Sequence, residues 1–251
     1  MSRKKLGMIL LATLALLPLM SAVSAYRPDN SVTLEEEGNV IVEYQIVPDT
    51  SATLHLALGY YADKLNPTSS TTAYDIDIIF LLFDGFMTAH PFKYFDIFSD
   101  MPWMLSEPPD WKIVDDPNYG KISRWIFKFR DDIKFFDGTQ LTADDVVFSY
   151  DFIKWLYPQS ELWYDIGRIL INASKVDDYT VKVYLNTTGL LSARYAMIIV
   201  FPKHIYEKGE TWGGSGTFPD WTVTPTQVVE YRAKSPTDPI LTGYGPFRLK
   251  E

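Results

Sequence analysis

WIFKFRDDIKFFDGTQLTADDVVFSY, residues 125–150, is the stretch that decides the fold, because each part of it predicts a different local structure. Trp125, Phe127 and Phe129 alternate with Ile126 and two basic residues, and this period of two is typical of a strand with one strongly apolar face. The Asp-Gly pair at 137–138 follows, and such a pair is typical of a tight turn. The first half of the stretch therefore predicts a strand and then a tight turn.

The second half of the stretch predicts the start of a helix. Thr142 is a good N-cap, and Asp145, three residues later, completes the pattern of a capping box. Carboxylates in a first helical turn suit the unpaired N–H groups and the positive end of the helix dipole. Apolar residues then continue at helical spacing, at Val146, Tyr150, Ile153 and Tyr157. We expect four residues of the stretch to serve folding and not chemistry: Asp137, Gly138, Thr142 and Asp145.

The same run resembles the signature segment of the extracytoplasmic solute-binding proteins of family 5, the oligopeptide and dipeptide receptors of ABC importers. The family pattern is close to F-x-L-R-x-x-V-x-F-x-D-G-x-x-L-T-A-x-D-V-x-F-S, and most of its positions are filled here. Further segments resemble the family in the same order, although the match at 101–106 is loose. These segments are 65–67 (LNP), 83–86 (FDGF), 101–106 (MPWMLS), 176–185 (VDDYTVKVYL), 201–206 (FPKHIY) and 243–251 (GYGPFRLKE).

The resemblance implies a mixed α/β (α+β) fold, a lobe like that of the type II periplasmic binding proteins with an accessory domain. It covers nearly all of residues 49–251 but only the N-terminal half of the family. We therefore expect a fragment that lacks the C-terminal lobe. The expected parts are a leader at 26–48, a discontinuous first lobe at 49–85 and 186–251, and an accessory second domain at 86–185.

Residue patterns outside the motifs predict a few further elements. Residues 40–44 are expected to contain a short strand, 53–61 the first strand of the core, and 72–85 a helix. Residues 207–239 carry a glycine-rich run and several prolines, so they predict a long surface excursion.

The first residues predict a secretory signal peptide, residues 1–25. A basic run at 3–5 precedes apolar residues 6–20, and cleavage is expected after the small residues 23–25. An uncleaved membrane anchor is the alternative, because the apolar segment is about as long as a bilayer span of roughly 20 residues. The chain has no cysteine, which excludes disulfides and a lipid attached through an N-terminal cysteine. We expect an exported protein, in the periplasm or at the outer cell surface.

The charge balance argues against a nucleic-acid partner. The chain has 23 Lys and Arg against 32 Asp and Glu, a formal net charge of -9. Phosphate contacts need clustered Lys and Arg, and the compact basic cluster at 3–5 belongs to the signal segment. Asn172 and Asn186 begin N-glycosylation sequons, which we interpret as expected surface positions.

The sequence carries no recognisable catalytic or metal-binding set. His55, His90 and His204 lack metal-ligand spacing, Ser149 lacks a nucleophile elbow, and no P-loop pattern occurs. Acidic pairs at 75/77, 131/132 and 144/145 suggest the two carboxylates of a glycosidase, but helix starts and a turn give them structural roles. We expect no enzymatic activity, no cofactor and no metal.

Three tyrosines are the candidate ligand contacts: Tyr60, Tyr61 and Tyr244. Tyrosine offers an apolar face with a polar edge, the first two end the expected opening strand, and Tyr244 replaces the usual Thr of the family's G-T-G-P. The resemblance implies that an oligopeptide, or alternatively an oligosaccharide, binds between two lobes and is delivered to an ABC transporter permease. Membrane contact is expected only through the permease or an uncleaved N-terminal segment. A secreted carbohydrate-active enzyme and a remnant that binds nothing remain open alternatives.

Overall fold

The computed structural model of the chain describes residues 31–34, 42–45, 64–69, 72–88, 101–189 and 196–249. The chain divides into two compact units, residues 1–58 and 59–251. In the first unit, β1 (Ser31–Leu34) pairs antiparallel with β2 (Val42–Gln45). β2 confirms the short strand expected near 40–44, whereas the strand expected at 53–61 lies outside the described residues. The finer division, with an accessory domain at 86–185, stays a prediction.

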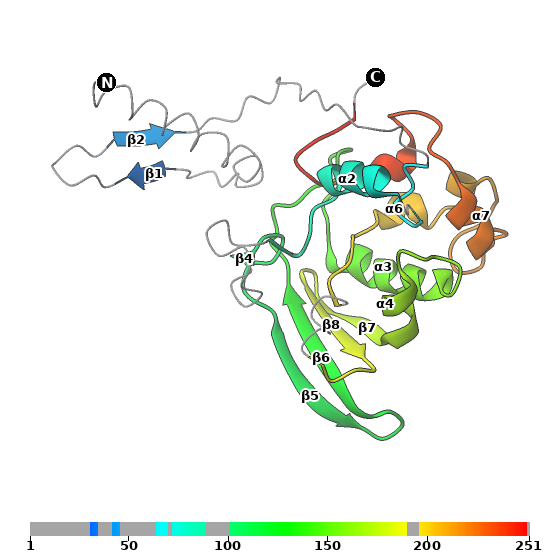
Figure 1. The fold of residues 1–251 in the computed structure, drawn as a ribbon, viewed down its shortest axis with the longest axis horizontal. Helices are drawn as coiled ribbons and strands as arrows, with labels where there is room; N and C mark the ends of the chain where they lie inside the picture. The colour runs from blue at the N-terminus through cyan, green and yellow to red at the C-terminus, as the bar shows by residue number, and fades with distance from the viewer. Residues whose placement is uncertain are drawn as a thin grey trace, which may run out of the picture. The chain divides into compact units, whose positions relative to one another are not determined.

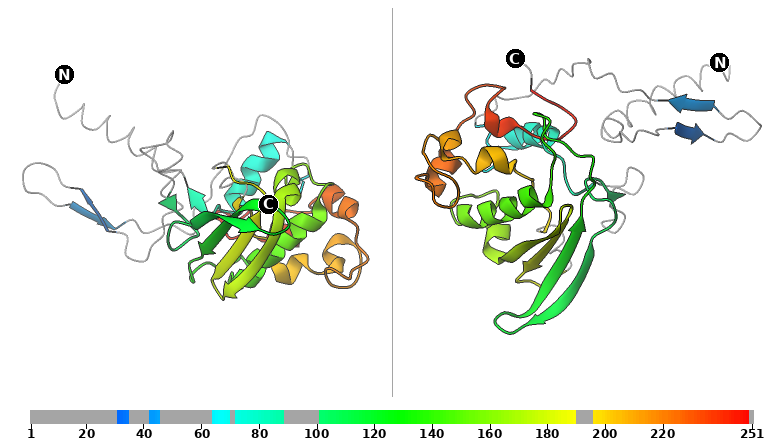
Figure 2. Two further views of the ribbon diagram at one scale, coloured as in Figure 1. Left: turned by 90° about the horizontal axis from the view of Figure 1, so that it is seen from below. Right: turned by 180° about the vertical axis from the view of Figure 1, so that it is seen from behind.

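The second unit is built on a four-stranded antiparallel sheet in the order β5-β6-β8-β7 (Figure 1). Its strands are β5 (Asp110–Asp116), β6 (Gly120–Lys128), β7 (Leu170–Asp177) and β8 (Thr180–Leu185). β6 confirms the predicted alternation, because Trp125 and Phe127 are buried on one face, opposite Val183 and Val181 of β8. Figure 2 shows the β5–β6 pair extending away from the helices.

Helix α3 (Ala143–Leu156) packs on the sheet against β7 and β8. Its residues at the predicted helical spacing, Val146, Tyr150 and Ile153, are fully buried, which explains why an amphipathic sequence forms a helix here. Tyr157, expected as a further helical position, is the C-cap, and its N–H donates to the Ile153 carbonyl. The apolar face of α3 and the Trp125 face of the sheet form the centre of the core.

Shorter elements complete the second unit. They are α2 (Ala73–Leu82), β3 (Met87–Thr88) paired with β4 (Met101–Pro102), α4 (Tyr164–Ile169), α6 (Lys203–Tyr206), η1 (Gly209–Trp212), α7 (Pro225–Glu230) and η2 (Pro239–Leu241). α2 confirms the helix expected at 72–85, and Phe80 on this helix is 59% exposed. Across the described ranges, none of these helices combines the length and the apolar character needed to cross a bilayer.

The surface excursion expected at 207–239 is wrong in part, because this segment also supplies core. Trp212, Trp221 and Val228 are buried, and Trp221 lies 6.1 Å from Phe152 and 5.4 Å from Trp155, ring centroid to ring centroid. The glycines that suggested a loop provide tight turns with positive φ, and these turns return the aromatic side chains to α3. The glycines correctly predict the turns, but the sequence does not predict that the side chains between the turns are buried against α3.

Candidate functional site

Motif segments that are far apart in the sequence meet at one junction, at the end of α2. The backbone N–H groups of Tyr244 and Gly245 donate to the Leu82 carbonyl at 3.0 and 2.7 Å, and the Phe136 N–H donates to the Gly243 carbonyl at 2.8 Å. A Cβ at Gly243 would overlap the Leu82 carbonyl oxygen, so this close approach requires glycine. The end of α2, the turn after β6 and the C-terminal motif are therefore joined backbone to backbone.

The motif at 101–106 joins the same junction between α2 and β6. The Trp103 N–H donates to the Phe86 carbonyl at 3.1 Å, and the Arg130 N–H donates to the Met104 carbonyl at 2.9 Å. Phe86 in turn packs edge-on against Phe129, with ring centroids 4.9 Å apart. Trp103 is thus carried on a backbone that is fixed on both sides.

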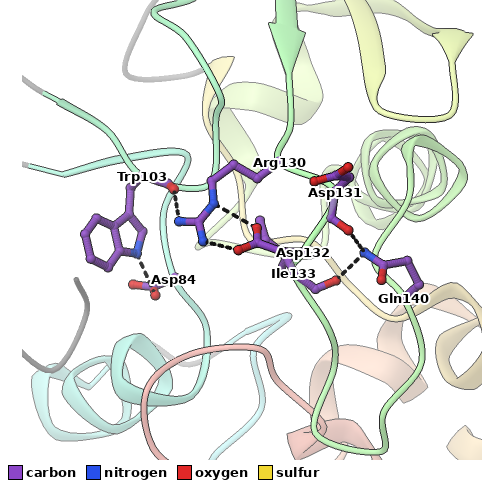
Figure 3. Close-up of polar contacts among 7 residues, drawn as sticks. All are labelled: Asp84, Trp103, Arg130, Asp131, Asp132, Ile133 and Gln140. Carbon is purple, nitrogen blue, oxygen red and sulfur yellow. Dashed lines mark hydrogen bonds and ion pairs between the residues drawn. The ribbon is translucent and has the colours of Figure 1, made fainter. Parts of the chain in front are cut away.

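Four side chains form a polar cluster at this junction (Figure 3): Asp84, Trp103, Arg130 and Asp132. The Trp103 indole Nε1–H donates to Asp84 Oδ2 at 2.8 Å. Arg130 donates from Nε and Nη2 to the two carboxylate oxygens of Asp132 at 2.9 and 2.6 Å, and from Nη1 to the Trp103 carbonyl at 3.1 Å. We call this group the Asp84–Trp103 cluster; its bonds hold Trp103 by both its indole and its backbone.

Asp84 and Asp132 have opposite electrostatic environments within the cluster. Asp84 is partly buried, and this burial raises the pKa of its carboxyl; the Trp103 hydrogen bond and the Arg130 charge offset the rise only in part. The Arg130 hydrogen bonds hold the pKa of Asp132 below its usual value. Within the described part of the chain, Asp84 forms no ion pair, because Arg130 directs its donors to Asp132 and to Trp103.

The turn at 137–138 ties β6 to the motif at 201–206. Gly138 has φ +91°, a conformation that residues with a Cβ rarely adopt. Asp137 accepts the Thr139 N–H at 2.9 Å through Oδ1 and contacts His204 Nε2 at 2.6 Å through Oδ2. Although partial burial opposes it, these bonds lower the pKa of Asp137. His204 belongs to α6, so a local turn residue also makes a long-range contact.

The start of α3 is organised around Asp145. This carboxylate is 6% exposed, and its Oδ2 accepts the backbone N–H and the hydroxyl of Thr142 at 3.0 and 3.1 Å. Its Oδ1 accepts the Lys203 N–H at 3.0 Å. Beside it, the Ser149 hydroxyl donates to the Asp145 carbonyl at 2.6 Å and accepts the Phe201 N–H at 2.7 Å. The residues that begin α3 therefore also hold the segment that begins α6.

Of the three candidate ligand contacts, Tyr60 and Tyr61 lie outside the described residues. Tyr244 is 8% exposed; its hydroxyl donates to the Asp84 carbonyl at 3.0 Å and accepts the Val200 N–H at 2.9 Å. Burial raises the pKa of this hydroxyl, so it stays neutral. Tyr244 thus connects segments of the junction, and its contact with a ligand stays a prediction.

At least one member of each acidic pair considered for glycosidase chemistry is buried or bonded within the fold. Asp144 pairs with Lys175 at 2.8 Å, Asp132 pairs with Arg130, and Asp75 is buried in the first turn of α2. In the ranges that the structure describes, no three or more acidic or histidine side chains are grouped to hold a metal ion. What the junction offers chemically is a set of fixed binding groups: a carboxylate, an indole and a guanidinium.

The model of one protein family, "Bacterial extracellular solute-binding proteins, family 5 Middle", matches residues 112–251. The chain belongs to this family. Among curated proteins, this family 5 chain is 29% identical over 130 residues to the uncharacterized protein y4wM of Sinorhizobium fredii. That match covers 51% of the chain and 17% of y4wM.

Solved structures show that the family 5 chain has the fold of the type II periplasmic binding proteins. One similar structure is the oligopeptide-binding protein AppA of Bacillus subtilis in complex with a nonapeptide, with a TM-score of 0.52 and 23% identity. Another is NikZ of Campylobacter jejuni in complex with Ni(L-His), with a TM-score of 0.50 and 20% identity. Each match covers 76% of this chain and 32% of the solved chain, so the chain spans about a third of their length. The mixed α/β fold class expected from the sequence is confirmed.

The sequence analysis did not identify the Asp84–Trp103 cluster as a site. Asp84 lies in the quoted motif at 83–86, and Trp103 lies in the segment 101–106, whose match to the family is loose. Neither segment by itself points to the other, because the hydrogen bond joins residues 19 positions apart in the chain.

Proposed function

We propose that this chain is the extracytoplasmic solute-binding component of an ABC importer, binding oligopeptides for delivery to a membrane permease. The observation that carries the proposal is the family 5 match over residues 112–251, a range that includes Arg130, Asp132 and the C-terminal motif of the junction. Binding sites for small ligands combine apolar surface with a few fixed polar groups, and the junction has this composition. Asp132, Asp144 and Asp145 are bonded within the fold, which supports binding in preference to glycoside hydrolysis.

An oligopeptide is the proposed ligand because the similar protein from Bacillus subtilis was solved with a nonapeptide. The second similar protein was solved with Ni(L-His), so the fold alone does not determine the ligand class. The choice therefore has to be made by experiment, with oligosaccharides as the alternative ligands.

Export, removal of residues 1–25 and delivery to a permease belong to the same proposal. They are supported by the basic and apolar pattern of the first residues and by the extracellular character of the family. Because the chain spans about a third of the solved relatives, closure of a second lobe over the ligand is also part of the proposal.

Native mass spectrometry of the full chain tests the ligand class. The chain is incubated with a mixture of peptides up to nonapeptides and, separately, with a mixture of oligosaccharides. We expect adducts with peptides, which are released and identified after denaturation. Retention of oligosaccharides alone would show that the ligand class is wrong, and hydrolysis of chromogenic glycosides would favour the carbohydrate-active enzyme.

A further inference from the structure

Three tripeptides of the chain have asparagine followed two residues later by serine or threonine: 66–68, 172–174 and 186–188. This is the spacing of an N-glycosylation sequon, provided that the middle residue is not proline. The first tripeptide has proline in the middle, so it is not an acceptor. The other two are permitted sequons, with Asn172 and Asn186 as the acceptors.

The fold uses the amide of Asn66, the asparagine of the excluded tripeptide. Its Nδ2 donates to the carbonyls of Val228 and Tyr231 at 2.7 and 3.0 Å. Its Oδ1 accepts the Thr68 N–H at 2.9 Å. Asn66 is 0% exposed, so a sugar on its nitrogen would have no room in the packed interior. Proline thus occupies the middle position in the one tripeptide whose glycosylation the fold could not accommodate.

Asn172 and Asn186 have the opposite environment. Both are exposed, as expected for sequon asparagines. In the part of the chain that the structure describes, neither of their side-chain amides forms a hydrogen bond. The same holds for the hydroxyls of Ser174 and Thr188, which complete the sequons and are partly or fully exposed. Both nitrogens and both hydroxyls are therefore available to an enzyme that recognises the sequon.

The sheet brings the two acceptors to one face. In the β8 segment 181–185 the odd-numbered residues are buried, so Tyr184 points to the opposite face. Asn172 of β7, the edge strand next to β8, pairs directly with Tyr184 (Figure 1). Asn186 follows Tyr184 by two residues, and its N–H donates to the Ile169 carbonyl at 2.8 Å. Two sequons that are separate in the sequence therefore flank one tyrosine on the side of the sheet away from α3.

These acceptors lie away from the Asp84–Trp103 cluster. The end of β8 nearest the cluster is Thr180, which pairs with Lys128 just before Arg130. Asn186 lies beyond the other end of β8, about 20 Å farther along at the rise of an extended strand. Bulky hydrophilic groups at this end of the strand pair therefore leave the junction accessible.

We propose that Asn172 and Asn186 are acceptor sites for N-linked glycans, carried on one face of the β7–β8 pair. The inference rests on the export that is part of the proposed function. In the reaction, Nδ2 of the asparagine forms a bond to C1 of a sugar held on a lipid phosphate by a membrane transferase. The bond between C1 and the phosphate oxygen breaks, the lipid phosphate leaves with the electron pair, and one amide proton passes to a base. The donor is thus a lipid-linked oligosaccharide.

Mass spectrometry of the full chain, purified from the cells that naturally produce it, tests the proposal. Peptide mapping locates each modification, and the intact mass gives the number of glycans. We expect glycan-bearing peptides that contain Asn172 and Asn186, and an unmodified peptide that contains Asn66. Occupancy of Asn186 should at least equal that of Asn172, because Asn186 follows the last strand residue whereas Asn172 is held within β7.

Four single variants produced in the same cells tie each glycan to its sequon. Ser174→Ala and Thr188→Ala remove the hydroxyl of one sequon, so each should remove one glycan from the intact mass. Ser174→Thr and Thr187→Ala are the matched controls, because each changes the same tripeptide and keeps a permitted sequon. Both controls should retain both glycans. Peptide adducts in native mass spectrometry should persist in all four variants, since the sequons lie away from the junction.

The outcomes separate the glycan sites from the proposed function. If the chain is exported and processed but both asparagines are unmodified, or if Ser174→Ala and Thr188→Ala keep both glycans, the sites are refuted while the proposed function stands. If the chain stays inside the cell with its first 25 residues and is unmodified, export and the glycan sites fail together. A glycan on only one asparagine supports that site and refutes the other.

Discussion

Substitution of Asp145 should destabilise the chain more than any other change at the start of α3. Its carboxylate accepts three hydrogen bonds, from the Thr142 N–H, the Thr142 hydroxyl and the Lys203 N–H. Asp145→Ala removes all three acceptor contacts and leaves two backbone donors without their partner. The same substitution loosens the link between α3 and the start of α6.

The magnitude follows from the chemistry of these bonds. A hydrogen bond to a charged group contributes about 1.5–3 kcal/mol, so the loss of two backbone partners should cost about 3–6 kcal/mol. Thr142→Ala removes only the hydroxyl donor, because the Thr142 N–H still reaches Asp145, and should cost about 1 kcal/mol. Asp145→Asn keeps one acceptor oxygen, which can serve Thr142 or Lys203 but not both, so its cost should lie between the two.

Urea unfolding of the full chain, followed by tryptophan fluorescence and by circular dichroism, measures these differences. A domain is typically stable by about 5–15 kcal/mol, so the loss expected for Asp145→Ala is a large fraction of the total. The midpoint should fall while the slope with urea stays constant, since a changed slope would indicate altered compactness. The reasoning is refuted if Asp145→Ala lies within about 1 kcal/mol of the wild type, or if Thr142→Ala costs as much as Asp145→Ala.

Gly138→Ala should cost about 1–2 kcal/mol and Gly138→Val more, because φ +91° is strained for any residue with a Cβ and no neighbour lies within 4 Å of that atom; equal stability of the three proteins in thermal unfolding would contradict this. Asp84→Asn should raise the unfolding temperature at pH 7. Burial raises the folded pKa of Asp84, so the protonated carboxyl stabilises the wild type at low pH, and this stabilisation is lost as pH rises through the folded pKa. The gain from asparagine should therefore disappear as pH falls below the ordinary pKa of 3.8, and a gain that persists there would exclude this cause. Tyr244→Phe should cost about 1–3 kcal/mol, since the buried Val200 N–H loses its acceptor; unchanged stability with loss of peptide binding would instead support a ligand contact. Mass spectrometry of the exported chain should show processing near Ala25, whereas an intact N-terminus would revive the anchor alternative.

Much of the local structure was predictable because its causes lie within a few residues. The alternation at Trp125 and Phe127 identified a strand, and the spacing of Thr142 and Asp145 identified a helix start. These signals depend on the period of two, on side chains three residues apart, and on backbone conformations that glycine alone adopts freely. The order of the motifs also indicated the family, and the family predicted the fold class.

The tertiary structure decided which distant groups share a site. Trp103 and Asp84 are 19 residues apart, and Asp145 and Lys203 are 58 apart, so no local spacing predicts either bond. The same holds for Trp221, whose segment has the composition of a surface loop but packs on Phe152 and Trp155 of α3. A side chain's burial and its charge partner depend on how whole elements pack, and packing sums many weak contacts that the local sequence does not encode. For that reason the sequence alone indicated a solute receptor, whereas the hydrogen bond between Asp84 and Trp103 became visible only in the folded chain.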